Sequence, residues 1–118
     1  MMNKLILATG SNSGYLHKMG RYFSSIESNS NFDENYLVYF DTNTIKLPLN
    51  KLKVCNVYRE DMEMIMSNSC LQHGEFLKSK EFDLNTNDDD VIFFTDCDIE
   101  IQRNLSDDEI FQFKNYFI

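Results

Sequence analysis

The chain has 118 residues, of which 42% are hydrophobic, including 10 Phe and 6 Tyr, so it does not have the composition of a disordered protein. Its formal net charge is −8 and its isoelectric point is about 4.6. Because phosphate backbones and anionic lipids attract basic proteins, this charge argues against a general nucleic-acid or membrane-surface binder. We expect a single domain over residues 1–118, in which a phosphorylated ligand requires a cation to bridge like charges.

Cysteine usage and the lack of long apolar runs predict a cytoplasmic protein. The three cysteines, Cys55, Cys70 and Cys97, show no metal-ligand spacing and are odd in number, which argues against a disulfide framework or a zinc site. Leu5–Ala8 is too short for the apolar core of a signal peptide, and no run reaches the length of a membrane span. We therefore expect reduced thiols and no membrane span.

The first part of the chain alternates between strand and helix patterns. A buried strand is expected over Lys4–Thr9, followed by a loop of small residues at Gly10–Gly14. Apolar residues at helical spacing predict a helix over Tyr15–Glu27. The run Tyr36–Phe40 is typical of a second strand, which would end at Asp41.

The second part repeats this alternation. A loop over Thr42–Asn50 precedes a short third strand at Leu52–Val57, and Arg59–Lys80 carries a second long helical pattern. A polar turn is expected over Asn85–Asp89, before a strongly apolar fourth strand at Asp90–Thr95.

The last predicted element is a short helix. Ser106 and Glu109 have the spacing of a capping box, which favours a helix start at this point. The complete order is β-α-β-β-α-β followed by this helix. Strands that alternate with helices indicate an α/β fold with a mostly parallel sheet covered on both faces.

The most informative feature is the acidic turn that closes the fourth strand, Asp96-Cys97-Asp98. Burying charge is costly, so both carboxylates should lie just outside the carboxyl end of the strand. In open α/β sheets, ligands bind at that end. Two carboxylates separated by one residue can hold a hard divalent cation through oxygen, and such a cation can neutralise a diphosphate.

A dinucleotide interpretation is the first alternative. The loop Thr9–Gly14 is similar to the first glycines of the short-chain dehydrogenase pattern, and Asp41 would suit a ribose hydroxyl. The position of the third glycine is occupied by Leu16, although that glycine permits close packing of helix on strand. Asp96 and Asp98 would also repel a pyrophosphate unless a metal intervened. An NAD(P)-binding domain therefore stays an alternative.

Three further interpretations apply to the acidic pair alone. In haloacid-dehalogenase-type phosphatases a similar pair follows a strand near the amino terminus and precedes Thr or Val, whereas Ile99 follows it here. A calcium EF-hand loop that started at Asp96 would need glycine at its sixth position, which is Ile101. In the purely structural interpretation, Asp96 and Asp98 only cap a turn.

The element order and the stretch Asp89–Ile99, a buried strand that ends in a DxD motif, resemble the amino-terminal, nucleotide-binding half of GT-A-type glycosyltransferases. The resemblance covers nearly all of the chain in element order. It implies a Rossmann-like, mostly parallel sheet and a metal-dependent, hexosyltransferase-like enzyme. Such an enzyme uses a UDP- or GDP-sugar as donor.

The resemblance also implies a donor site across the carboxyl ends of the strands. Asp98 would ligate Mn²⁺ or Mg²⁺, and Asp96 would contact the ribose or the metal. Lys78 and Arg103 are candidate contacts to the diphosphate or the sugar. The residues implied for the nucleotide pocket are Thr9, Gly10, Ser11, Tyr15 and Asp41.

The acceptor side of such an enzyme follows the DxD motif, and only 20 residues follow Asp98. We therefore keep three hypotheses: an active transferase, a partial or non-catalytic sugar-nucleotide-binding module, and an interaction domain that retains the fold. An oligomer, or a longer domain of which this chain is the amino-terminal part, is expected for the same reason. No catalytic base is identified.

Overall fold

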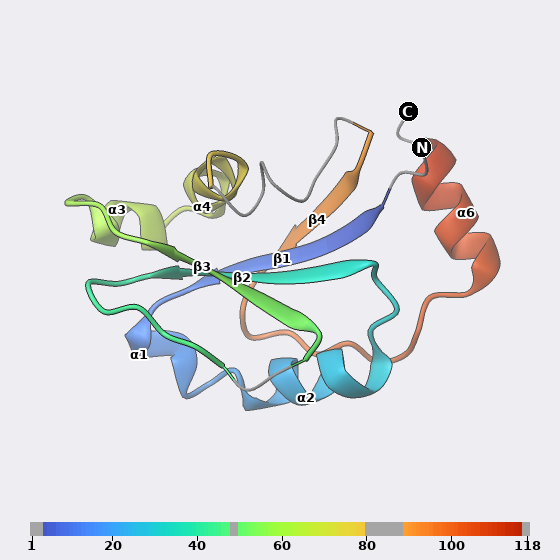
Figure 1. The fold of residues 1–118 in the computed structure, drawn as a ribbon, viewed down its shortest axis with the longest axis horizontal. Coiled ribbons are helices and arrows are strands. Elements are labelled where there is room, and N and C mark those ends of the chain that lie inside the picture. Colours follow the sequence, from blue (N-terminus) through green and yellow to red (C-terminus); the bar gives the residue numbers. More distant parts are fainter. Residues whose placement is uncertain (1–3, 48–49, 80–88, 117–118) are drawn as a thin grey trace.

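The computed structural model describes residues 4–47, 50–79 and 89–116. It contains one four-stranded, all-parallel sheet in the order β3-β2-β1-β4 (Figure 1). The strands are β1 (Leu5–Ser11), β2 (Glu34–Phe40), β3 (Leu52–Val57) and β4 (Val91–Thr95). The α/β class predicted from the alternation of strands and helices is confirmed.

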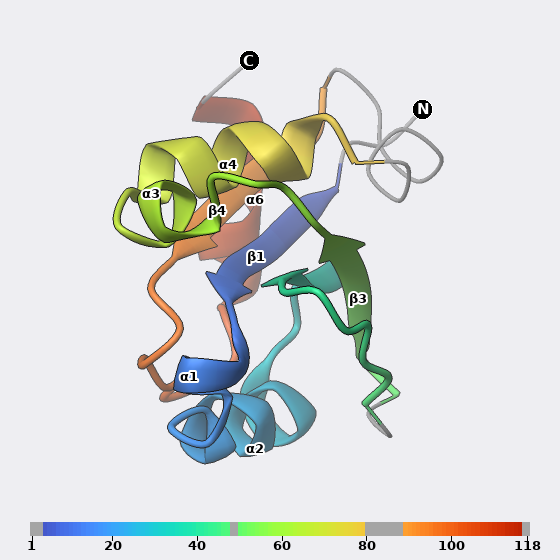
Figure 2. The ribbon, with the colours of Figure 1, turned by 90° about the vertical axis from the view of Figure 1, so that its left-hand side faces the viewer.

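Helices lie on both sides of this sheet and form three layers with it (Figure 2). Helices α1 and α2 lie on one side and α3 and α4 on the other, while α6 lies beside the end of the sheet at which β1 begins (Figure 1). No helix in the described part of the chain is long and apolar enough to cross a membrane. The helices are α1 (Ser13–Leu16), α2 (Gly20–Asn29), α3 (Met62–Met66), α4 (Ser69–Leu77) and α6 (Asp107–Tyr116).

Alternate residues of the strands build two separate cores. In β1, Ile6 and Ala8 belong to the core that contains Phe76 of α4. Leu7 belongs to the opposite core, which contains Tyr22 of α2. This period of two is the pleat of a strand that is buried on both faces, as the continuous apolar runs in the sequence predict.

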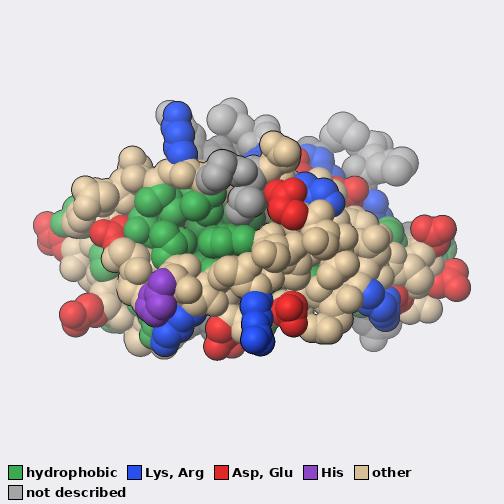
Figure 3. Space-filling view, turned by 90° about the horizontal axis from the view of Figure 1, so that it is seen from below, with side chains coloured by type: hydrophobic (Ala, Val, Ile, Leu, Met, Phe, Trp, Pro, Cys, Tyr) green, Lys and Arg blue, Asp and Glu red, His purple; other side chains and the backbone are tan. Residues whose placement is uncertain are grey.

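On the side of α2, hydrophobic side chains reach the surface in one continuous area (Figure 3). Half-buried members of the core on this side include Phe23, Ile45 and Leu47. The segment after β2 is tied to β3 here, because the Ile45 N–H donates to Oδ1 of Asn56 at 2.9 Å. Part of the loop after β2 therefore packs on the α2 side of the sheet.

The single helix predicted over Tyr15–Glu27 is wrong, because the chain forms two helices there. The Asn12 side chain accepts from the Tyr15 N–H and caps α1. The chain leaves the helical conformation at Met19, with φ −95° and ψ 7°, and α2 starts at Gly20. Met19 is fully buried in the core on the α2 side, so the break allows this side chain to reach the sheet.

The single helix predicted over Arg59–Lys80 is also wrong. It is divided into α3 and α4 at Asn68, whose side chain accepts from the N–H groups of Cys70 and Leu71 and caps α4. An asparagine side chain that bonds the backbone in this way favours a new helix start over continuation. Lys80 and most of the polar turn predicted at Asn85–Asp89 lie outside the described residues.

The first strand is longer than predicted at its carboxyl end. Gly10 and Ser11, expected in a loop, belong to β1, because the parallel pairing with β2 continues to Ser11 and Tyr39. This places Gly10 inside the sheet instead of in a flexible turn.

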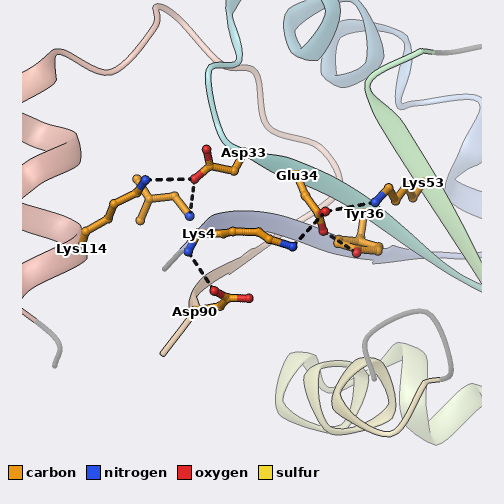
Figure 4. Close-up of polar contacts among 8 residues, drawn as sticks. Lys4, Asp33, Glu34, Tyr36, Lys53, Asp90 and Lys114 are labelled. Carbon is orange, nitrogen blue, oxygen red and sulfur yellow. Dashed lines mark hydrogen bonds and ion pairs between the residues drawn. The ribbon is translucent and has the colours of Figure 1, made fainter. Parts of the chain in front are cut away.

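Ionic contacts join the strands at their amino ends (Figure 4). The Glu34 carboxylate is bonded by Lys4 at 3.3 Å, by Lys53 at 3.1 Å and by the Tyr36 hydroxyl at 2.6 Å. The Lys4 N–H donates to the Asp90 carboxylate at 2.8 Å. Burial and the neighbouring Glu34 carboxylate raise the pKa of Tyr36 above its ordinary value, so its hydroxyl stays a donor.

The predicted capping box at the start of α6 is confirmed. The Ser106 N–H donates to Glu109 at 2.9 Å, and the Glu109 N–H donates to the Ser106 hydroxyl at 3.1 Å. Near its other end, α6 is fixed to the strands by an ion pair of 3.3 Å between Lys114 and Asp33, which precedes β2 (Figure 4). The capping box therefore defines the start of the helix, and the ion pair fixes its other end to the strands.

Candidate functional site

A pocket of about 250 Å³ lies at the carboxyl end of the sheet, where β1 and β4 end side by side. It receives residues from β1, from α1 and the turn after it, from α3 and α4, and from the turn after β4. The lining residues are Gly10, Tyr15, Lys18, Met66, Gln72, Asp96, Cys97 and Asp98. The opposite, amino ends of the strands carry the ionic cluster around Glu34 (Figure 4).

The acidic turn after β4 forms one wall of this pocket. Asp96 and Asp98 are exposed and both line it, as expected for carboxylates excluded from a buried strand. Cys97 between them is half-buried and packs against the core on the α2 side. Burial and then the Asp98 charge raise the pKa of the Cys97 thiol, so it stays protonated at neutral pH.

The donor set of the turn fits a hard cation that is shared with a ligand. Within residues 4–47, 50–79 and 89–116, no group of three or more His, Cys, Asp or Glu side chains is placed to hold a metal by itself. Asp96 and Asp98 supply two carboxylates, and Mg²⁺ is commonly held by one or two carboxylates together with substrate phosphates and water. This wall is therefore suited to a cation that arrives with an oxygen-rich ligand.

Thr9 and Ser11 do not line the pocket. Thr9 is fully buried, and its hydroxyl donates to the Thr95 carbonyl at 2.7 Å. Ser11 is also fully buried, and its hydroxyl donates to the Asn12 carbonyl at 3.2 Å. The Thr9 bond links β1 to the residue that immediately precedes Asp96, so it holds the base of the acidic turn.

Tyr15 and Lys18 form the lip of the pocket on the side of α1. Tyr15 is 44% exposed, and Nζ of Lys18 lies 5.6 Å from the centroid of its ring, within the range of a cation–π contact. Lys18 was not predicted from the sequence. It lies three residues after Tyr15, in the turn that breaks the expected helix, so its place at the pocket depends on that break.

Asp41 closes β2 next to this lip but does not line the pocket. Its carboxylate accepts from the Ser13 N–H at 3.2 Å and from the Thr42 N–H at 2.7 Å. Hydrogen bonds from Ser13 and then from Thr42 lower the pKa of Asp41 to about 2. The carboxylate therefore stays charged and fixes the start of α1 to the end of β2.

Gln72 of α4 contributes a buried amide to the pocket. Its Nε2 group donates to the carbonyls of Ile65 at 3.2 Å and Met66 at 3.3 Å, at the end of α3. Its other end lies against Gly10, since a Cβ built on Gly10 would be 2.3 Å from Oε1 of Gln72. The sequence held a signal for this residue: Gln72 lies on the same helical face as the buried Phe76, and a polar residue on an apolar face is usually bonded or functional.

Lys78 and Arg103 do not line the pocket. Lys78 is exposed at the end of α4. Arg103 is bound to the Glu109 carboxylate, with distances of 2.6 and 3.1 Å, at the start of α6. Of the residues expected at the donor site, the structure brings together Gly10, Tyr15, Asp96 and Asp98.

No protein-family model, curated protein or solved structure matches this chain. What the pocket binds must therefore be inferred from its chemistry. It combines two exposed carboxylates, one lysine beside a tyrosine ring, and one buried amide.

Proposed function

We propose that this protein binds a nucleoside-diphosphate sugar with the help of Mn²⁺ or Mg²⁺ and transfers the sugar to an acceptor. One observation carries the binding step: Asp96 and Asp98 share a pocket with Tyr15 and Lys18 at the carboxyl ends of β1 and β4. Ligands of open α/β sheets bind at this end of the strands. The transfer step is supported by the resemblance of the DxD strand to GT-A-type glycosyltransferases.

Each polar residue of the pocket has a role in this proposal. Asp98 and Asp96 would hold the divalent cation, and when bound this cation supplies charge neutralisation for the leaving nucleoside diphosphate. Lys18, beside the Tyr15 ring, adds a second positive charge to the pocket. The exposed Tyr15 ring offers a face on which a base can stack. Gly10, which has no side chain, leaves room for the Gln72 amide beside it.

The charge of the protein supports a cation-dependent mode of binding. The chain carries a net charge of −8, and both aspartates of the turn are exposed at the pocket. A diphosphate alone would be repelled by these carboxylates, whereas a bridging cation reverses the sign of that interaction. The three cysteines are free thiols, which agrees with the cytoplasm, the location that we propose.

Calorimetric titration of UDP and GDP, with and without Mn²⁺, tests the binding step. We expect binding only with the metal, and at least about tenfold weaker binding for Asp98→Asn, because a charge-assisted contact contributes about 1.5–3 kcal/mol. Asp108→Asn, which changes an exposed aspartate on α6, is the matched control and should bind like the wild type. Metal-independent binding, or unchanged binding by Asp98→Asn, would contradict the proposal.

Release of UDP or GDP from a panel of nucleotide sugars tests the transfer step. We expect metal-dependent release that is lost in Asp98→Asn and retained in Asp108→Asn. Tight binding of the donor without release, in the presence of candidate acceptors, would favour the binding-module hypothesis over the transferase.

A dinucleotide-binding function is the second candidate, favoured by the sheet. The order β3-β2-β1-β4 is shared with dinucleotide-binding folds, and Asp41 directly follows β2. The Asp41 carboxylate is already bonded to Ser13 and Thr42, which leaves it less free for a ribose. Binding of NAD⁺ or NADP⁺ without metal, unaffected by Asp98→Asn, would favour this candidate instead.

A further inference from the structure

We infer that Gln72 determines the nucleoside specificity of the pocket by accepting a hydrogen bond from an N–H or O–H group of the nucleoside. This inference rests on the proposed binding of a nucleoside diphosphate and names the contact that selects it. It is carried by the orientation of the Gln72 amide, by its burial and by its contact with Gly10.

The orientation of the amide is fixed by its surroundings. Both hydrogens of Nε2 are directed to carbonyl oxygens, those of Ile65 at 3.2 Å and Met66 at 3.3 Å. An amide rotated by 180° would place Oε1 against these two acceptors, which would repel it. Gln72 therefore presents an acceptor and not a donor on its other side.

The acceptor is available to a ligand. Oε1 of Gln72 has no hydrogen-bond partner among the residues that the structure describes, although the residue is only 8% exposed. Both Gln72 and Gly10 line the pocket, and Oε1 lies where a side chain on Gly10 would otherwise be. An acceptor that lines a pocket and receives no donor from the described protein is complemented by a ligand that supplies one.

The chemistry of the complementary group follows from this geometry. A uracil offers an imide N–H, a guanine offers a ring N–H, and the ribose offers hydroxyl groups; all three are donors. A ligand that lacks the donor leaves Gln72 unpaired on binding. Sites built to bond a ligand N–H or O–H discriminate strongly against analogues without it.

Titrations with modified nucleotides test this contact. In the presence of Mn²⁺, wild type would be titrated with UDP, 3-methyl-UDP, which lacks the imide N–H, and 2′-deoxy-UDP, which lacks one ribose hydroxyl. If GDP is the tighter ligand, 1-methyl-GDP and 2′-deoxy-GDP take their places. We expect one analogue to bind at least about tenfold more weakly than the parent nucleotide, and that analogue identifies the group that Gln72 meets.

The same titrations with Gln72→Met separate hydrogen bonding from shape. Methionine keeps a similar length without the amide, so the preference for the parent nucleotide should fall to nearly one. A penalty caused only by a steric clash with the added methyl group would persist in this variant. Gln112→Met makes the same exchange at an exposed position on α6 and should keep the wild-type preference.

The outcomes distinguish this inference from the proposed function. No binding of UDP or GDP by the wild type would overturn both. Metal-dependent binding that Asp98→Asn abolishes, combined with equal affinity for parent and analogues, would overturn the role of Gln72 alone. A preference that survives in Gln72→Met would do the same. If Gln72→Met does not fold, equal affinity of the wild type for parent and analogues would still overturn the role of Gln72.

Discussion

Replacement of Gly10 by alanine should destabilise the protein through one added methyl group. A Cβ at this position would lie 2.3 Å from Oε1 of Gln72 and 3.0 Å from Cε2 of Phe40. The Gln72 amide has little freedom to withdraw, because its Nε2 is bonded to Ile65 and Met66. Overpacking of this kind costs about 1–3 kcal/mol.

Denaturant unfolding of Gly10→Ala beside Gly74→Ala provides the measurement. A Cβ on Gly20 or Gly74 would meet no atom within 4 Å, and no described glycine has a positive φ. Gly74→Ala, inside α4, should therefore raise the free energy of unfolding by up to about 1 kcal/mol. If Gly10→Ala proves as stable as the wild type, or gains stability as Gly74→Ala does, the close contact with Gln72 is refuted.

Three other predictions concern local hydrogen bonds and charge. Thr9→Val should lower the free energy of unfolding by about 1 kcal/mol, because the Thr95 carbonyl loses its donor. Thermal unfolding beside the wild type measures this change, and an unchanged stability would show that the bond is dispensable. Ser106→Ala should cost about 1 kcal/mol through loss of the capping box, with reduced helical circular dichroism, and an unchanged spectrum would contradict the role of the cap. Asp41 and Glu109 both have a folded-state pKa of about 2, below the ordinary values of 3.8 and 4.5, so the unfolded state takes up more protons between these limits. Stability should therefore fall as the pH drops from about 4.5 toward 2, and less steeply in the double variant Asp41→Asn, Glu109→Gln; parallel pH profiles would refute this origin.

The sheet could be predicted from the sequence because buried parallel strands leave a direct signal. The expected strand at Leu52–Val57 has the bounds of β3, and the run at Asp90–Thr95 differs from β4 by one residue. Short apolar runs between polar turns favour a strand over a buried helix when they are rich in β-branched and aromatic residues. The parallel pairing followed from the alternation of strands with helices.

The helix boundaries could not be predicted because they depend on competition between side chains and backbone. The helical patterns continue through Met19 and through Asn68, yet α1 ends at Leu16, α3 ends at Met66, and Met19 and Asn68 precede new helices. At Asn68 the side chain captures two N–H groups, and at Met19 burial of the side chain outweighs continuation of the helix. A periodic pattern shows which face is buried and does not show where an asparagine interrupts it.

Only some of the residues that line the pocket could be predicted from the sequence, for the same reason. Asp96 and Asp98 follow a strand whose end is obvious in the sequence, so their position was predictable. Lys18 and Gln72 reach the pocket from segments whose placement depends on the two helix breaks. Tertiary contacts, which no local pattern encodes, bring these residues together with Gly10.

The pairing of β1 with β4 determines when the sheet can be completed during synthesis. Leu5 pairs with Val91 and Thr9 with Thr95, so one edge of β1 stays without its partner until residues 91–95 have left the ribosome. Pairings of such long sequence separation form slowly, and an unpaired apolar edge is a template for association with other chains. The acidic turn follows β4 directly, so its pocket exists only after this last strand has docked. A ligand that requires Asp96 and Asp98 would therefore recognise only completed molecules, and would protect them against unfolding.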